Sequence, residues 1–153
     1  AYSLFLKKKP EYYYLIVGKK GWFYGEIFKI VEELDIKNKV IFLGYLPEED
    51  LPVIVKNSSG VLMLNYYEGF GLPAIEAYSF KVPVLLSNIK VFRSIFKDNE
   101  VLFSDPNNLG EISESMERLV GNYKTEFNPE IIQEYSWGNV AKNTMSLFNH
   151  FSA

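Results

Sequence analysis

Residues 61–80 read Val-Leu-Met-Leu-Asn-Tyr-Tyr-Glu-Gly-Phe-Gly-Leu-Pro-Ala-Ile-Glu-Ala-Tyr-Ser-Phe, and this stretch decides the fold class. It begins with four apolar residues, the pattern of a short strand that is buried on both faces. A loop with two glycines follows, and Pro73 stands where a helix would begin, which is a favoured position for proline. The stretch therefore predicts one strand–loop–helix unit.

The same alternation of short apolar runs and helical patterns continues along the whole chain. Further strands are predicted at residues 13–17, 40–44, 83–86 and 101–103. Helices are predicted at residues 1–9, 22–34, 48–56, 73–80, 91–96, 109–120, 130–135 and 137–151. Strands joined by helices imply right-handed crossovers and a parallel sheet with helices on both faces. We therefore expect one α/β domain over residues 1–153, with a Rossmann-like doubly wound parallel sheet and C-terminal helices.

Two of these elements carry a more specific expectation. The apolar run at residues 13–17 is typical of a strand that is covered on both faces. The acidic residues 48–50 should lie in the first turn of their helix, where the helix dipole stabilises negative charge.

Composition excludes several classes of function. The formal net charge of −3 offers no basic face, so nucleic acid is not an expected partner. The chain has no cysteine, which excludes disulfides and fits a reducing, cytoplasmic compartment. With His150 as the single histidine, we expect no metal site. No run of about 18 apolar residues is present, so we expect no membrane span. Residues 1–9 resemble a helix without a capping residue, which suggests a longer parent chain.

The loop at residues 65–76 is the richest candidate site. Parallel sheets of this type bind ligands at the carboxyl ends of their strands. The free amide groups of a helix that begins at Leu72 or Pro73 would suit phosphate or sugar oxygens. Glu68 and Glu76 would line the same crevice and accept hydrogen bonds from hydroxyl groups. A nucleotide sugar combines both kinds of group. The alternative is purely structural, since glycines make turns and the dipole alone favours such glutamates.

Glu68 and Glu76, embedded in Glu-Gly-Phe-Gly-Leu-Pro-Ala-Ile-Glu-Ala, resemble a family signature. It is the Glu-x7-Glu motif of the group 1 glycosyltransferases, which are retaining enzymes built from two Rossmann domains (GT-B type). Other blocks match in the same order, at residues 15–18, 40–47, 83–84, 87–88, 105–106 and 127–137. The resemblance implies that this chain is the C-terminal, donor-binding domain and that an N-terminal acceptor domain is missing.

The resemblance also implies roles for individual residues. Glu68 would contact the donor sugar and is the catalytic candidate. Glu76 would bind the ribose hydroxyls. The donor-binding residues would be Gly18, Lys19, Tyr45, Leu46, Gly69, Phe70, Gly71, Leu72 and Glu76. Gly18 would face the phosphates, and the backbone near Tyr45 would meet the nucleobase.

The implied reaction is a hexosyl transfer from a UDP- or GDP-linked sugar to a glycan, lipid or polysaccharide precursor. It would retain the anomeric configuration and need neither metal nor cofactor. In agreement, no Asp-x-Asp pair occurs in the sequence. The isolated domain would be inactive. The full-length enzyme would be cytoplasmic, with any contact to the inner membrane face made through the missing half.

Some positions depart from the family pattern. Lys81 replaces the usual glycine before the strand at residues 83–86, and Ser94 replaces a commonly acidic residue. Leu64 and Asn65 replace the usual Pro-Ser. The departures at Lys81 and Ser94 leave open one alternative, a degenerate, non-catalytic module that binds a nucleotide or sugar. A separate alternative is a sugar-nucleotide epimerase of the same fold, which would need different catalytic acids and which the Glu-Gly-Phe-Gly block disfavours.

Overall fold

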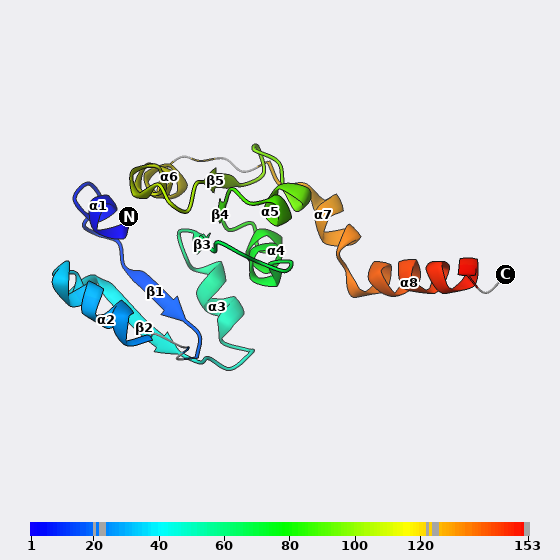
Figure 1. The fold of residues 1–153 in the computed structure, drawn as a ribbon, viewed down its shortest axis with the longest axis horizontal. Helices are drawn as coiled ribbons and strands as arrows, with labels where there is room; N and C mark the ends of the chain where they lie inside the picture. Colours follow the sequence, from blue (N-terminus) through cyan, green and yellow to red (C-terminus); the bar gives the residue numbers. More distant parts are fainter. Residues whose placement is uncertain (20, 22–23, 122, 124–125, 152–153) are drawn as a thin grey trace.

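The computed structural model describes residues 1–19, 21, 24–121, 123 and 126–151. Within them, two parallel sheets are formed by β1 (Tyr14–Val17), β2 (Val40–Gly44), β3 (Val61–Met63), β4 (Val84–Ser87) and β5 (Leu102–Ser104). Strand β1 pairs with β2, and the other three follow the order β3-β4-β5 (Figure 1). The parallel α/β architecture predicted from the sequence is therefore confirmed.

Helices connect the strands. They are α1 (Tyr2–Leu6), α2 (Tyr24–Glu33), the short 3-10 helix η1 (Lys37–Lys39), α3 (Leu51–Lys56), α4 (Leu72–Ser79), α5 (Lys90–Ile95), α6 (Leu109–Val120), α7 (Pro129–Glu134) and α8 (Trp137–Phe151). Among the described residues, no helix is long and apolar enough to cross a membrane. Residues 22 and 23, part of one predicted helix, lie outside the described residues.

Two expectations about local structure are wrong. Helix α3 begins at Leu51, so residues 48–50 precede the helix and do not lie in its first turn. Strand β1 is not covered on both faces, because the side chains of Leu15 and Val17 are each 39% exposed. In β4, by contrast, Val84 and Leu85 are completely buried. The difference arises because core clusters pack on both faces of β4, whereas Leu15 and Val17 belong to neither cluster.

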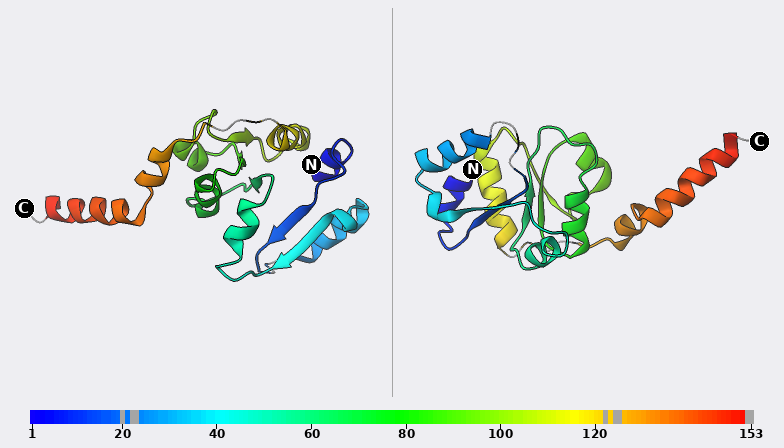
Figure 2. Two further views of the ribbon diagram at one scale, coloured as in Figure 1. Left: turned by 180° about the vertical axis from the view of Figure 1, so that it is seen from behind. Right: turned by 90° about the horizontal axis from the view of Figure 1, so that it is seen from below.

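The core lies on the two faces of the β3-β4-β5 sheet. Val84 and Leu86 pack on one face against residues of α4 and α5, including Tyr78 and Phe92. Leu85 points the other way and joins a second cluster, formed by Phe5, Leu85, Leu102, Ile112, Met116 and Leu119. Helices α1 and α6 therefore cover one face and α4, α5 and α7 the other (Figure 2).

The C-terminal helix α8 projects away from this body (Figures 1 and 2). Its start is capped as predicted, since the Asn139 backbone N–H donates to Ser136 Oγ at 3.3 Å. Trp137 and Phe148 remain 82% and 65% exposed. Helix α8 therefore contributes little to the core of the chain described here.

Candidate functional site

The loop between β3 and α4 is fixed by Gly71. Its φ of 91° and ψ of 47° lie in the left-handed region, which only glycine adopts without cost. A Cβ atom at this position would lie 2.5 Å from Cε1 of Phe92, a side chain with no exposed surface. Both the backbone conformation and the packing therefore require glycine where α4 begins.

The beginning of α4 is open to a ligand. Gly71 is its N-cap, and no side chain accepts a hydrogen bond there. Leu72, the first helical residue, is 52% exposed. A Cβ atom on Gly69 would meet nothing within 4 Å, so the backbone of this glycine borders open space. The helix start therefore presents uncapped backbone and the positive end of the helix dipole.

Glu68 is held inside its own loop. Its Oε2 accepts a hydrogen bond from Asn65 Nδ2 at 2.8 Å, and its Oε1 accepts one from the Gly69 backbone N–H at 2.9 Å. An ionised carboxylate can accept about four hydrogen bonds, so Glu68 keeps capacity for a ligand hydroxyl. Sequence reasoning missed Asn65 as a partner. The spacing of three residues within a loop was the available signal.

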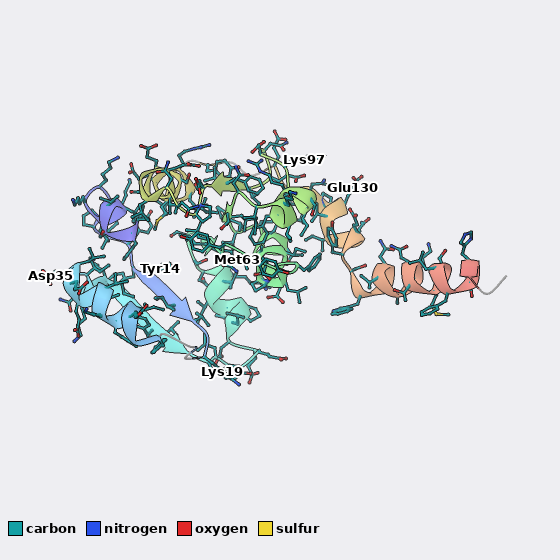
Figure 3. The ribbon with its side chains drawn as sticks, in the orientation of Figure 1. Tyr14, Lys19, Asp35, Met63, Lys97 and Glu130 are labelled. Carbon is teal, nitrogen blue, oxygen red and sulfur yellow. The ribbon has the colours of Figure 1, made fainter. Side chains whose placement is uncertain are left out.

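Glu76 faces the cleft that separates β1 from β3. The cleft has a volume of about 640 Å³, and its lining includes Glu76, Pro73, Val17 and Met63. Figure 3 marks its two sides with Tyr14 of β1 and Met63 of β3, both of which line it. The Glu76 carboxylate is exposed and has no hydrogen bond or ion pair with any other described residue. Glu68 is not part of this lining.

The carboxyl ends of β1 and β2 bring three predicted residues together. The Gly18 backbone N–H donates to Gly44 O at 2.8 Å, with Gly18 at a φ of 139°. Lys19 Nζ lies 5.0 Å from the centre of the Tyr45 ring. A small pocket of about 160 Å³ is lined by Gly18, Lys19 and Gly44. Lys19 thus supplies positive charge at this edge, where Figure 3 labels it.

Two further predicted site residues, Phe70 and Leu46, have less exposed surroundings than Tyr45. The Phe70 ring packs edge-on against Tyr135, with the ring centres 5.0 Å apart, so only its backbone remains for a ligand. Leu46 is half-buried beside the exposed Tyr45. Neither observation conflicts with the roles implied for them, which involve backbone atoms.

The structure explains the role of Lys81, the residue that stands where the family pattern has glycine. Its φ is 59°, and its N–H donates to Tyr78 O at 2.9 Å. The next N–H, from Val82, donates to Ala77 O at 3.2 Å. These two bonds form a Schellman motif that ends α4, with Lys81 at the left-handed position that glycine usually occupies. This departure from the family pattern therefore concerns the C-terminal end of the helix, away from its start at Gly71.

The comparisons with known proteins agree with this geometry. A family model described as glycosyl transferases group 1 matches residues 1–144. The chain belongs to this family. O-antigen chain mannosyltransferase B from Escherichia coli is 29% identical to it over 157 aligned positions, covering 97% of this chain and 40% of the relative.

Two solved structures are similar to the chain in fold. Sucrose-phosphate synthase from Thermosynechococcus elongatus has a TM-score of 0.86 at 22% identity, over 98% of this chain and 41% of that protein. HepE from Anabaena, solved in complex with UDP, has a TM-score of 0.75 at 19% identity, over 94% of this chain and 42% of that protein. The chain thus spans about two fifths of the length of each of these proteins.

Proposed function

We propose that this chain is the donor-binding domain of a cytoplasmic glycosyltransferase and holds a UDP- or GDP-linked sugar at the carboxyl ends of its strands. Transfer would retain the anomeric configuration and need no metal. The acceptor would bind to an N-terminal domain of the same polypeptide. The observation that carries the proposal is Glu76: an exposed carboxylate, without a partner among the described residues, about one turn inside an uncapped helix start.

The chemistry of the site suits a ligand with an anionic part and a hydroxyl-rich part. The uncapped start of α4 and the Lys19 ammonium group favour a diphosphate. Carboxylates repel phosphate but accept strong hydrogen bonds from hydroxyls. Glu76 therefore pairs with the ribose, and Glu68 with the donor sugar. The UDP complex of HepE, a protein of the same fold, supports a nucleotide as the ligand class.

The nucleotide role of Glu76 is tested by calorimetry with UDP, GDP and ADP. We expect one nucleoside diphosphate to bind preferentially, and Glu76→Ala to weaken its affinity about 10–100-fold, since hydrogen bonds to a charged group contribute about 1.5–3 kcal/mol. Glu114→Ala is the matched control, because Glu114 is an exposed carboxylate on α6, outside the cleft lining. Equal affinities for the Glu76 variant and the wild type would refute the assignment.

The role of Glu68 is tested in the full-length enzyme. Glu68→Ala should lower kcat/KM strongly while the affinity for the bare nucleoside diphosphate changes little, because the proposed contact is with the sugar. Asn65→Ala should lower kcat/KM less, because it removes only the Asn65 Nδ2 donor that holds Oε2 of Glu68. Unchanged turnover of the Glu68 variant would remove this residue from the mechanism.

A further inference from the structure

Two tyrosines on the loop between β3 and α4 leave their rings uncovered. Tyr66 and Tyr67 are 71% and 87% exposed, and Tyr67 is more exposed than any other large hydrophobic residue in the described part of the chain. Their side chains make no hydrogen bond, ring contact or cation–π contact with any other described residue. Each of the other nine of the 11 tyrosines packs against an aromatic ring or has a cation over its own ring. The pair therefore differs from every other tyrosine in having no partner within the described chain.

The turn that carries the pair is held in place. Asn65 Nδ2 donates to Glu68 Oε2 at 2.8 Å, and this hydrogen bond joins the two residues that flank the tyrosines. Glu68 Oε1 also accepts a hydrogen bond from the Gly69 backbone N–H at 2.9 Å. A loop that is already ordered loses less entropy when a ligand binds to it. Tyrosine has only two side-chain torsions, so its ordering cost is small for the contact area that it offers. The turn therefore presents the two rings as a preorganised surface.

We infer that Tyr66 and Tyr67 bind the acceptor, and that this acceptor presents a sugar ring to them. The inference rests on the proposed function, because it takes Glu68 as the residue that contacts the donor sugar. For transfer, the acceptor oxygen must come within about 3–3.5 Å of the anomeric carbon of the donor. Adjacent Cα atoms are about 3.8 Å apart, so Tyr67 stands directly beside Glu68 and its ring can reach an acceptor in that position.

A sugar ring suits the pair better than a lipid chain does. Tyrosine combines an apolar ring with a polar hydroxyl group. Its ring can pack against the C–H groups of a pyranose while its hydroxyl group exchanges hydrogen bonds with the sugar hydroxyls. A lipid chain would need a continuous apolar surface, whereas the residues that flank the pair are the exposed Asn65 and the half-buried Glu68, both of them polar. The surroundings of the rings therefore favour a ligand that is itself partly polar.

Steady-state kinetics of the full-length enzyme test the inference with defined probes. The donors are UDP-glucose and GDP-mannose, and the acceptors are the methyl and octyl glycosides of mannose, glucose and galactose. Hydrolysis of the donor without acceptor is followed as a second reaction, because it needs the donor site alone. The variants replace Tyr66 and Tyr67 together, either by alanine or by phenylalanine. Tyr13→Ala is the matched control, because Tyr13 is 57% exposed and lies at the amino end of β1, on the opposite edge of the sheet.

The alanine variant should raise the acceptor KM at least about tenfold, because exposed aromatic residues often dominate the affinity of a binding surface. The rise should be the same for methyl and octyl glycosides, since the contact is with the sugar ring. The kcat and KM of donor hydrolysis should stay within about twofold of the wild-type values, because the rings do not contact the donor. The phenylalanine variant keeps both rings and should recover most of the acceptor affinity. Tyr13→Ala should leave all of these constants unchanged.

Several results would overturn the inference. An acceptor KM that does not change, or a wild type that hydrolyses the donor but uses no glycoside as acceptor, would exclude a sugar on these rings. A rise in the donor KM alone would place the rings on the donor, and an effect confined to octyl glycosides would place them on the lipid tail. A lower Tm of the alanine variant with unchanged kinetics would show that the rings pack against the rest of the polypeptide. A wild type that neither binds nor hydrolyses either donor would instead refute the proposed function, and the inference with it.

Discussion

Gly71→Ala is the sharpest test of how the candidate site is built. The substitution adds one methyl group at the residue that starts α4, and it leaves every polar group in place. The φ of 91° at this position is unfavourable for alanine. The new Cβ atom would also stand 2.5 Å from Cε1 of the buried Phe92 ring. Phe92 belongs to the main core cluster, so the ring cannot move aside freely.

The free energy of unfolding should fall by about 1–4.5 kcal/mol. A left-handed conformation costs a non-glycine residue about 1–2 kcal/mol, and overpacking a core costs about 1–3 kcal/mol. Alanine also reduces the entropy of the unfolded chain, which stabilises the folded state by about 0.4–1 kcal/mol. For a domain of about 150 residues, such a loss lowers Tm by about 2–18 °C.

Urea denaturation compares the free energy of unfolding of Gly71→Ala with that of Gly69→Ala. Gly69 lies two residues away in the same loop, and a Cβ atom there would meet nothing within 4 Å. Gly69→Ala should therefore change stability by no more than about 0.5 kcal/mol, although its methyl group would obstruct a ligand on the loop backbone. Equal destabilisation of the two variants, or a Gly71 variant as stable as the wild type, would refute the packing argument.

Three further predictions concern parts of the fold away from this loop. Lys81→Val should lower stability by about 1–2 kcal/mol, because branched residues resist the left-handed conformation, whereas Lys81→Gly should be at least as stable as the wild type in urea. Burial raises the pKa of Tyr2 to about 12, above its unfolded value near 10. The resulting stabilisation is complete below pH 10 and is lost as the pH rises towards 12, so Tyr2→Phe should show a smaller drop in urea midpoint between pH 9 and pH 11. Asn128→Ala should cost about 1–3 kcal/mol in urea denaturation, because it uncaps α7 and removes the Nδ2 donor, at 3.1 Å, from the buried Glu100.

The order of the elements and the class of fold could be predicted from the sequence. Strands that are buried in a parallel sheet need continuous apolar runs, and these runs place the strand ends within one residue. The run at residues 83–86, for example, appears as β4 at Val84–Ser87. Glycine and proline at residues 69–73 likewise locate the start of α4, because few other residues fit such a turn.

Features that depend on distant parts of the chain could not be predicted. The local pattern of β1 indicates a strand covered on both faces, but the cover must come from residues distant in the sequence, and Leu15 and Val17 each remain 39% exposed. The hydrogen bond from Asn65 to Glu68 depends on how the loop closes after the strand. The start of α3 at Leu51 is a similar case, because acidic residues suit both a helical turn and the exposed segment that precedes it.

The two ends of α4 explain why one glycine of the family pattern is present and another is not. At Gly71 the chain needs a left-handed conformation and also has no space for a Cβ atom. At Lys81 it needs only the conformation, and the exposed side chain lies over the Phe127 ring, with Nζ 5.1 Å from its centre. A lysine there costs about 1 kcal/mol of backbone strain, partly offset by this cation–π contact. The cost falls on the stability of the fold, at the end of α4 opposite the candidate site. The departure at Lys81 therefore gives no support to a degenerate binding module.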